Sequence, residues 1–464
     1  MVTAMIVTLS VVLGLLIVGV EGLRPPPKGH IDFLRATSAV YFICFVVLPL
    51  YLQIDHLQTL RGGEWSWLLK RPFDDPAFAY AIALALVGYG CIILGFYLGS
   101  GFRSGKRGGQ AENPGTRMVW RSPELVLVGG LLGLAGLICL VVYTKSIGGL
   151  GPLILQAALF RSATPPVVTP FAFLKTLAPM VIAGTFLIHS VRARNRLEGQ
   201  APRYGVAFYT FLVASLLVLF HQAGRFPLAA FLLTFPLAQV IRTGRVRAAV
   251  VAGGSAVILA ILLFGKQLFQ AALTGTAVSD QWALVGQNVL APVRLLMVEF
   301  AFPVATLANA TVEVPAVIPF RWFFDVPLAL VYLIPQRLLG VVHDPTVSMV
   351  NTGRFAILGG VVPVDLVSFG YFSAGILGVV MVLVAFGGVL AWLGRLLPAT
   401  KDPVDCVLRA AWILFVALRV MYGDPQLIWP GGLHLLIMAA LLMAVRILVE
   451  EDSILGRVSP APTG

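Results

Sequence analysis

Arginine and histidine residues gather in a few polar stretches of a chain that is otherwise strongly apolar. One stretch, residues 336–355, contains Arg337, His343, Asp344 and Arg354. Arginine keeps its charge at any ordinary pH and binds phosphate oxygens through two parallel hydrogen bonds. A neutral histidine can accept a proton from an attacking hydroxyl group near pH 7. Together these residue types suit a site that holds phosphate and activates a hydroxyl group.

His343 stands directly before Asp344 and Pro345. Side chains of adjacent residues rarely form the hydrogen bond that a catalytic His–Asp pair needs, and Asp before Pro is typical of a turn. We therefore predict His343 as the general base and interpret Asp344 as a turn residue. Glu299 and Asp344 are the next candidates for the base.

The surrounding stretch, residues 265–365, has a near-balanced charge. Its cations are Lys266, Arg294, Arg321, Arg337 and Arg354, and its acids are Asp280, Glu299, Glu313, Asp325, Asp344 and Asp365. Such a mixture suits recognition of a phosphate or pyrophosphate among neutral polar groups. Ordinary surface charge is the alternative interpretation for any one of these residues.

Two shorter segments also carry candidate cations. The connection HQAGRFP at 221–227 places His221 before Arg225, at the expected start of a helix whose free N–H groups would favour an anion. The alternative for Arg225 is an arginine that extends to the membrane surface. The segment GPLILQAALFRS at 151–162 contains Arg161 and is predicted to be an amphipathic helix lying on the membrane surface.

The elements that position these residues must be membrane helices. Hydrophobic residues make up 58% of the 464 residues and charged residues 12%, against roughly 25% charged residues in soluble domains. So little charge cannot cover a water-soluble fold, so lipid must be the solvent. The four cysteines form no motif typical of a disulfide or metal site.

A helix that crosses a bilayer needs about 20 mostly apolar residues. Eleven segments qualify, at 2–22, 36–53, 76–101, 123–144, 170–191, 204–222, 226–241, 247–264, 366–394, 404–421 and 428–449. The predicted fold is therefore all-α, a polytopic helical membrane protein with about 11 transmembrane helices. Residues 1–264 hold the first eight, residues 265–365 form one large loop, and residues 366–464 hold the last three and a tail.

The distribution of Lys and Arg predicts the orientation of the helices. With the amino terminus outside, 20 of the 33 Lys and Arg residues fall in loops on the cytoplasmic side. The carboxyl terminus is then cytoplasmic and the large loop external. The net charge of +12 is a signal of topology, and no nucleic-acid partner is predicted.

Two apolar segments inside the large loop, 282–308 and 322–334, contain Pro and charged residues. Their lengths and composition fit interfacial or re-entrant helices better than full spans.

Several enzyme signatures are missing from the sequence. No GxxxxGK[ST] loop and no HExxH motif occurs, so neither nucleotide hydrolysis nor a zinc site is supported, and no cofactor or metal is expected. The pair Asp74–Asp75 before Pro76 is typical of a helix start. Few ionisable residues lie inside the predicted spans, and this argues against an ion-coupled transporter.

The segment HQAGRFPLAAFLLTFPL after the sixth span, the long external loop and VVPVDLVSFGYFSAGILGVVMVLVAFGG at 361–388 resemble the Wzy-type polymerases of bacterial O-antigen and exopolysaccharide repeat units. The resemblance rests on Gly224–Arg225 and on the glycine pattern that includes Phe369, Gly370, Gly375 and Gly378. It covers mainly residues 205–395.

The resemblance implies a glycosyltransferase of the bacterial inner membrane. Its substrates would be oligosaccharides linked through pyrophosphate to a polyprenyl lipid, and its partners a flippase and a chain-length regulator. The expected pyrophosphate ligands are Arg225, Arg337 and Arg354, and the expected base is His343. Further substrate contacts are expected from Arg321, Arg161 and His221.

Three other functions remain open at this level. An O-antigen ligase would share the architecture but use a different acceptor sugar. A glycosyltransferase that uses polyprenyl-phosphate sugars would place an acid such as Asp55 or Asp74 near the first external loop. A flippase of lipid-linked oligosaccharides would line a cavity within the spans with basic residues.

Overall fold

The computed structural model of the chain is built of helices. It describes residues 1–25, 31–58, 73–101, 122–155, 157, 169–201, 203–222, 225–245, 253–254, 256–257, 259–263, 293, 296–297, 300–334, 344–353 and 362–455. Within these ranges there is no β-strand, so the all-α prediction holds for the described chain.

Eight of the described helices are long and apolar enough to cross a membrane. They span Val2–Leu23, Phe33–Ile54, Pro76–Ser100, Ser122–Ser146, Leu174–Leu197, Arg225–Thr243, Leu366–Leu396 and Pro425–Val445. A shorter apolar helix covers Gly205–His221. The chain is therefore a helical, multi-pass membrane protein, while the count of eleven and the orientation stay predictions.

The helices of the first half are α1 (Val2–Leu23), α2 (Phe33–Phe42), the π-helical turn η1 (Ile43–Val47), α3 (Leu48–Gln58), α4 (Pro76–Ser100), α5 (Ser122–Ser146), α6 (Leu150–Leu155), α7 (Leu174–Leu177), α8 (Met180–Leu197), α9 (Gly205–His221) and α10 (Arg225–Thr243). Those of the second half are α14 (Phe302–Glu313), α15 (Asp325–Val331), α17 (Val347–Thr352), α18 (Leu366–Leu396), α19 (Pro403–Ala417), the 3₁₀ turn η5 (Leu418–Val420) and α20 (Pro425–Leu455).

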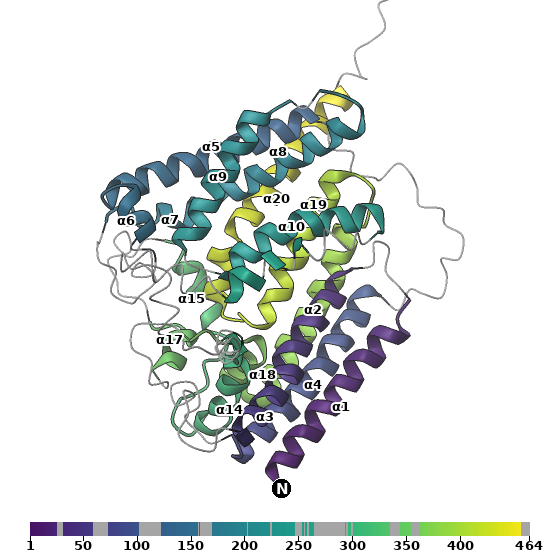
Figure 1. Cartoon of the computed structure of the whole chain (residues 1–464), viewed down its shortest axis with the longest axis vertical. Helices are drawn as coiled ribbons and strands as arrows, with labels where there is room; N and C mark the ends of the chain where they lie inside the picture. The colour runs from purple at the N-terminus through teal and green to yellow at the C-terminus, as the bar shows by residue number, and fades with distance from the viewer. Residues whose placement is uncertain are drawn as a thin grey trace, which may run out of the picture.

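The helices pack in three groups (Figure 1). Helices α5, α8 and α9 lie together at the top of the view, α10, α19 and α20 cross the middle, and α1 to α4 pack beside α18 below. The short helices α6, α14, α15 and α17 gather toward the left and bottom of the view. We call this end of the bundle the α15 end.

Ion pairs join the helix connections at the opposite end. Arg24 pairs with Glu21 and Asp32, and so ties α1 to the start of α2. Arg194 near the end of α8 pairs with Asp402 at the start of α19. Arg24 and Arg194 both lie on the side that the predicted orientation makes cytoplasmic, and both lie close to acids of neighbouring connections.

Aspartates fix where several helices begin. The side chain of Asp75 accepts a hydrogen bond from Ala77 N at 2.9 Å, and Pro76 occupies the first position of α4. This is the helix start that the Asp–Asp–Pro sequence predicts. Asp32, Asp365 and Asp402 cap α2, α18 and α19 in the same way.

Helices α4 and α18 meet through glycines and form the most extensive contact between described elements. A Cβ added to Gly95 would lie 2.0 Å from the carbonyl oxygen of Val384, and one added to Gly387 would lie 2.1 Å from that of Ile92. Lipid surrounds membrane helices with material as apolar as their side chains, so close backbone packing is a main source of their association.

The sequence predicts one uninterrupted helix at 366–394, but α18 is broken. Ala374 and Gly375 have non-helical backbone angles, and Gly375 has a φ of 61°. Gly378 then packs on Gly370, where an added Cβ would lie 2.0 Å from the carbonyl oxygen of Gly370. The first two turns of α18 therefore fold against its longer second part, and only residues 376–396 continue across the bundle.

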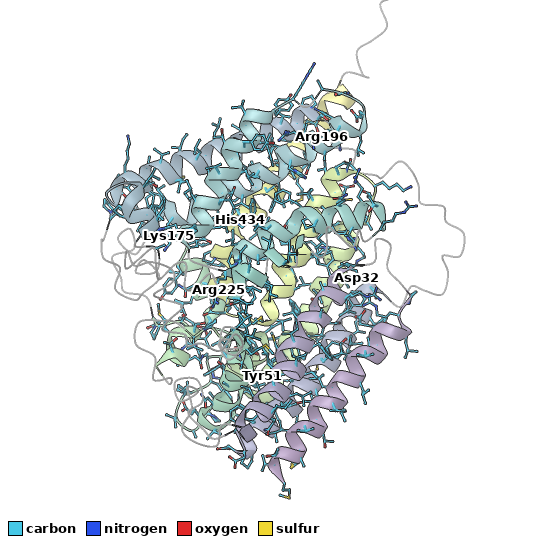
Figure 2. The ribbon with its side chains drawn as sticks, in the orientation of Figure 1. Asp32, Tyr51, Lys175, Arg196, Arg225 and His434 are labelled. Carbon is cyan, nitrogen blue, oxygen red and sulfur yellow. The ribbon has the colours of Figure 1, made fainter. Side chains whose placement is uncertain are left out.

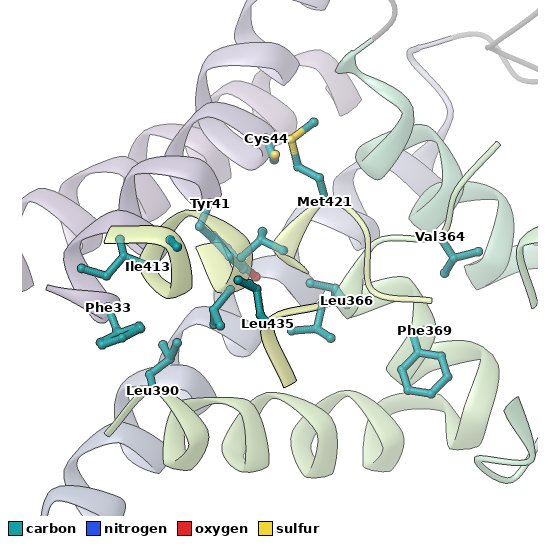
Figure 3. Packing of buried hydrophobic residues seen from close by; sticks show 14 of the residues in the cluster. Phe33, Tyr41, Cys44, Val364, Leu366, Phe369, Leu390, Ile413, Met421 and Leu435 are labelled. Carbon is teal, nitrogen blue, oxygen red and sulfur yellow. The ribbon is translucent and has the colours of Figure 1, made fainter. Parts of the chain in front are cut away.

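The core joins these groups from within. Figure 3 shows Phe33 and Tyr41 of α2, Leu390 of α18 and Ile413 of α19 packed together. The hydroxyl of Tyr41 is fully buried and donates to the carbonyl oxygen of Ala85 at 2.6 Å. The core therefore positions α18, whose broken end forms part of the site described next.

The two uncertain segments of the large loop differ in burial. Helix α14, which begins within the predicted segment 282–308, is buried from Phe302 to Ala310 and packs on α4 and α18. Helix α15 lies within the predicted segment 322–334, and Val326 and Leu330 on it are exposed. The prediction that both segments are interfacial or re-entrant helices stays open.

Candidate functional site

The segment before α15 hydrogen-bonds to the break in α18. The backbone N–H of Arg321 donates to the carbonyl oxygen of Phe372 at 3.0 Å, and that of Trp322 donates to Ser373 at 2.9 Å. The break in α18 interrupts its own hydrogen-bond ladder and leaves these two carbonyls without helical partners. Arg321 is therefore held in place by the interruption of a membrane helix.

Trp322 and Phe323 have left-handed backbone angles, with φ of 48° and 61°. Such angles cost a bulky residue on the order of 1–3 kcal/mol. The bonds to α18 help to offset this cost. The backbone thus turns sharply directly after Arg321 and directs the chain into α15.

The guanidinium of Arg321 is oriented by a buried carboxylate. Its Nε and Nη2 donate to the two carboxylate oxygens of Asp325 at 2.5 and 2.8 Å, and Nη2 also donates to the carbonyl oxygen of Pro345 at 2.8 Å. The Asp325 side chain is 1% exposed and that of Arg321 is 15% exposed. These three bonds do not use Nη1.

Arg321 is the charged residue of a cleft of about 420 Å³. The cleft is lined by Val317, Ile318, Pro319, Phe320, Arg321, Phe324 and Val350. Small-molecule sites have volumes of about 300–1,000 Å³ and combine apolar walls with a few polar groups. The cleft has both properties, and the guanidinium of Arg321, the charged group among its described lining residues, favours an anionic ligand.

Buried aspartates bind α17 to the cleft. Asp325 accepts from the backbone N–H of Val347 at 2.9 Å, and Asp424, just before α20, accepts from that of Ser348 at 3.2 Å. Burial raises the pKa of Asp424 above its ordinary value, and the negative charge of nearby Asp325 acts in the same direction. The start of α17, whose N–H groups lack helical partners, therefore rests on two carboxylates.

Further polar contacts tie α17 to neighbouring helices. The Nδ2 of Asn351 donates to Thr306 Oγ1 of α14 at 3.3 Å and to the carbonyl oxygen of Val362 at 3.2 Å. The backbone N–H of Val364 donates to Ser348 Oγ at 3.3 Å. One face of α17 is thereby held by α14 and by residues 362–364, which lead into α18.

Asp365 caps the short first part of α18 and is completely buried. It accepts hydrogen bonds from the backbone N–H groups of Val367 and Ser368 and from the Ser368 hydroxyl. Burial raises the pKa of Asp365 to about 7, although these hydrogen bonds act in the opposite direction. The carboxyl group therefore changes protonation state near neutral pH.

Asp344 lies on the surface beside Arg321. Its carbonyl oxygen accepts from the Tyr332 hydroxyl at 3.0 Å, and the next residue, Pro345, accepts from Arg321. Asp344 is exposed, and its interpretation as a turn residue stays a prediction. Burial raises the pKa of the Tyr332 hydroxyl above its ordinary value, and the negative charge of Asp344 acts in the same direction.

Arg225 begins α10, as the sequence predicts. Its Nη1 donates to the carbonyl oxygen of Leu262 at 2.7 Å. The ring of Phe226 packs 4.5 Å from Phe300 and 5.8 Å from Tyr422, measured between centroids. Because Tyr422 lies two residues before Asp424, the start of α10 adjoins the connection that also supports α17. Figure 2 labels Arg225, to the left of the centre of the view.

His221 is 3% exposed and lies at the end of α9. Its Nδ1 is 2.9 Å from the carbonyl oxygen of Leu153, and its Nε2 is 3.1 Å from the Tyr143 hydroxyl. Both ring nitrogens thus contact protein groups. In this arrangement His221 joins α9 to α5 and α6.

The other predicted site residues lie outside the described residues. These are Arg161, Arg337, His343 and Arg354, together with Glu299. Of the predicted residues, the structure therefore places Arg225, Arg321 and His221, and assigns only Arg321 to the cleft.

Three contributors to the cleft were missed by the sequence analysis: Asp325 as a partner, and Phe320 and Phe324 as walls. The sequence FRWFFD at 320–325 contains a signal, since an arginine amid aromatic residues is typical of a binding surface. The four-residue spacing of Arg321 and Asp325 would suggest a pair across one helical turn, but the left-handed residues between them bring the two side chains together without such a turn.

No group of three or more His, Cys, Asp or Glu residues suited to a metal ion occurs within the described parts of the chain. No protein-family model, curated protein or solved structure matches the sequence or the fold.

Proposed function

We propose that this chain is a membrane glycosyltransferase that polymerises polyprenyl-pyrophosphate-linked oligosaccharides at the external face of the bacterial inner membrane. The observation that carries the proposal is the cleft at the α15 end, which combines apolar and aromatic walls with the oriented guanidinium of Arg321. A substrate that joins an anionic pyrophosphate to a sugar and a long apolar chain matches such a lining.

In the proposed reaction, a hydroxyl group of one repeat unit attacks the anomeric carbon of the growing chain. A glycosidic bond forms, the bond between that carbon and the pyrophosphate oxygen breaks, and polyprenyl pyrophosphate departs. The hydroxyl proton passes to a base. The energy of the pyrophosphate linkage drives the transfer, so neither ATP nor a nucleotide sugar takes part.

Arg321 has the properties that the departing group requires. Its Nε and Nη2 are held by Asp325, so the guanidinium does not have to reorganise when negative charge develops on the leaving oxygen. The remaining Nη1 is the group that we assign to the pyrophosphate. Arg225, at the start of α10, is a second proposed pyrophosphate ligand.

The proton acceptor is proposed to be His343, as in the sequence analysis. Asp344 is the alternative, because it precedes Pro345, whose carbonyl oxygen accepts from Arg321, and its side chain is exposed. Asp344→Asn and His343→Ala therefore distinguish the two assignments, since loss of the base lowers kcat more than it raises KM.

Reconstitution of the full chain in liposomes tests the proposal. The liposomes contain a synthetic polyprenyl-pyrophosphate oligosaccharide and no ATP, and products are separated by size. Products of several repeat units support the polymerase. Transfer only to an added lipid A core acceptor identifies a ligase instead, and movement of the substrate across the bilayer without bond formation identifies a flippase.

A further inference from the structure

A second arginine site lies at the end of the bundle opposite the cleft. Arg192 and Arg196 stand four residues apart on α8, and therefore on one face of that helix. Arg192 is 8% exposed, whereas Arg196 is exposed. Figure 2 places Arg196 near the top right of the view, away from the α15 end.

The Arg192 guanidinium lies against two aromatic rings of α9. Its central carbon is 4.6 Å from the centre of the Phe208 ring and 5.2 Å from that of Tyr209. Tyr209 is 59% exposed, so the guanidinium lies beside a ring at the protein surface. The faces of the rings attract the cation, but they do not neutralise its charge as a carboxylate would.

Among the described residues, no acid forms an ion pair with Arg192. Its Nε is buried and has no hydrogen-bond partner among the described residues. Nearby acids on the same connections are otherwise engaged: Asp402 pairs with Arg194, and Glu198 accepts from Gln200. A largely buried guanidinium with an unpartnered Nε is costly, and an anion from outside the chain would stabilise it.

Helix α10 adds charge at the same level. The Phe186 ring packs 5.5 Å from that of Phe231, and the His189 ring packs 4.8 Å from that of Phe235. The contacts advance together along α8 and α10, so the two helices run in the same direction. Arg196 stands seven residues after His189 on α8, and Arg242 stands seven residues after Phe235 on α10. The last turns of both α8 and α10 therefore carry basic residues.

We propose that Arg192 and Arg196 bind the phosphate of an anionic phospholipid at this end of the bundle. Arg192 lies near the end of a helix that is long and apolar enough to cross a membrane, where headgroup phosphates are found. Basic pockets between membrane helices bind anionic headgroups. The exposed Tyr209 ring would contact the same lipid. This site is independent of the proposed glycosyl transfer.

Native mass spectrometry of the full chain, purified in detergent, tests the site. The wild-type protein is titrated with phosphatidylglycerol or with phosphatidylcholine, and the variants Arg192→Gln and Arg196→Gln are compared with Arg203→Gln. Arg203 is an exposed arginine on the same α8–α9 connection and serves as the matched control.

Wild-type protein should retain phosphatidylglycerol in preference to phosphatidylcholine. Each of the two test variants should bind it about ten-fold more weakly, as expected for loss of one charge-assisted contact, and Arg203→Gln should be unchanged. Arg196 is exposed, so Arg196→Gln is expected to fold even if Arg192→Gln does not.

Thermal unfolding with inorganic phosphate separates a lipid from a free anion. Phosphatidylglycerol should raise the unfolding temperature of the wild-type protein, while millimolar phosphate should not. Equal stabilisation by phosphate and lipid would overturn the assignment to a lipid. Unchanged phosphatidylglycerol binding by Arg196→Gln would overturn the site itself.

Discussion

At Arg321 a buried carboxylate determines what the guanidinium can do. Asp325 holds two of its nitrogens, and Pro345 accepts a further bond from one of them. Such a pair fixes the plane of the guanidinium, and removal of either partner would leave an unpaired charge. A test of Arg321 must therefore preserve the charge that Asp325 requires.

Arg321→Lys meets this requirement. Lysine can still pair with Asp325, but it cannot hold the carboxylate bidentately while presenting another nitrogen to the cleft. We expect the rate of elongation in liposomes to fall by about 100-fold, with normal membrane insertion. Arg395→Lys, the same change at the far end of α18, should keep the wild-type rate. An equally active Arg321→Lys protein would remove Arg321 from the site.

Asp365 should make stability depend on pH. Folding raises the pKa of Asp365 to about 7, from about 3.9 in an unfolded chain. Between these values the folded protein retains a proton that the unfolded chain has released. The contribution of Asp365 to the free energy of unfolding is therefore greatest below about pH 4 and falls as the pH rises to about 7.

Asp365→Asn should abolish this dependence. Asparagine caps helices about as well as aspartate and carries no charge. The variant should be more stable than the wild type at pH 8, by on the order of a few kcal/mol, and the two should converge toward pH 4. Thermal unfolding in detergent from pH 4 to 8 measures the difference. A constant difference across this range would contradict a titrating Asp365.

Among elements, the broken helix α18 connects the bundle to the cleft. Its freed carbonyls at Phe372 and Ser373 accept from the segment that carries Arg321. The glycine pattern that suggested a resemblance to polymerases has a physical role here, because Gly375 adopts a left-handed φ and Gly378 packs on Gly370. Whatever the reaction, these glycines shape the cleft.

Gly378→Ala should therefore destabilise the fold. The new Cβ would lie 2.0 Å from the carbonyl oxygen of Gly370, so the two parts of α18 must separate. We expect a loss of about 1–3 kcal/mol or more, measured as a lower unfolding temperature in detergent. Gly394→Ala is the control on the same helix, since nothing lies within 4 Å of its Cβ. Equal stability of the two variants would show that the bend is absent.

The contact between α4 and α18 supports a parallel test. Gly95→Ala would place a Cβ 2.0 Å from the Val384 carbonyl oxygen, whereas nothing lies within 4 Å at Gly90 of the same helix. Gly95→Ala should lower the unfolding temperature. Gly90→Ala should leave it unchanged or raise it slightly, because alanine favours helices by about 0.5–1 kcal/mol over glycine. The reverse order would contradict the packing of α4 on α18.

For the whole molecule, the two ends of the bundle differ in chemistry. One end holds the cleft and the buried aspartates that surround α17. The other holds ion pairs and Arg192, whose buried Nε has no hydrogen-bond partner among the described residues. The excess of Lys and Arg in the connections of the second end predicts that it faces the cytoplasm.

Cysteine labelling checks this orientation. In a variant without the four native cysteines, Trp322→Cys and Arg196→Cys place thiols at exposed positions of opposite ends. A membrane-impermeant maleimide added to spheroplasts should label position 322 and should reach position 196 only after permeabilisation. Labelling of position 196 in intact spheroplasts, with position 322 protected, would invert the topology and place the cleft in the cytoplasm.

The sequence by itself determined the class of the protein, because apolar segments of about 20 residues with so little charge leave no solvent but lipid. It also located helix starts such as Asp75–Pro76 and identified Arg321 among the candidate cations. These features depend on neighbours along the chain.

Only the tertiary structure decided which candidates meet. It paired Arg321 with Asp325, joined that segment to the break in α18, and placed His221 between Leu153 and Tyr143. Hydropathy indicates how strongly a segment prefers lipid. It does not predict where a helix bends or which face of one helix packs against which other helix. Those outcomes depend on backbone contacts between residues far apart in sequence, such as Gly95 with Val384.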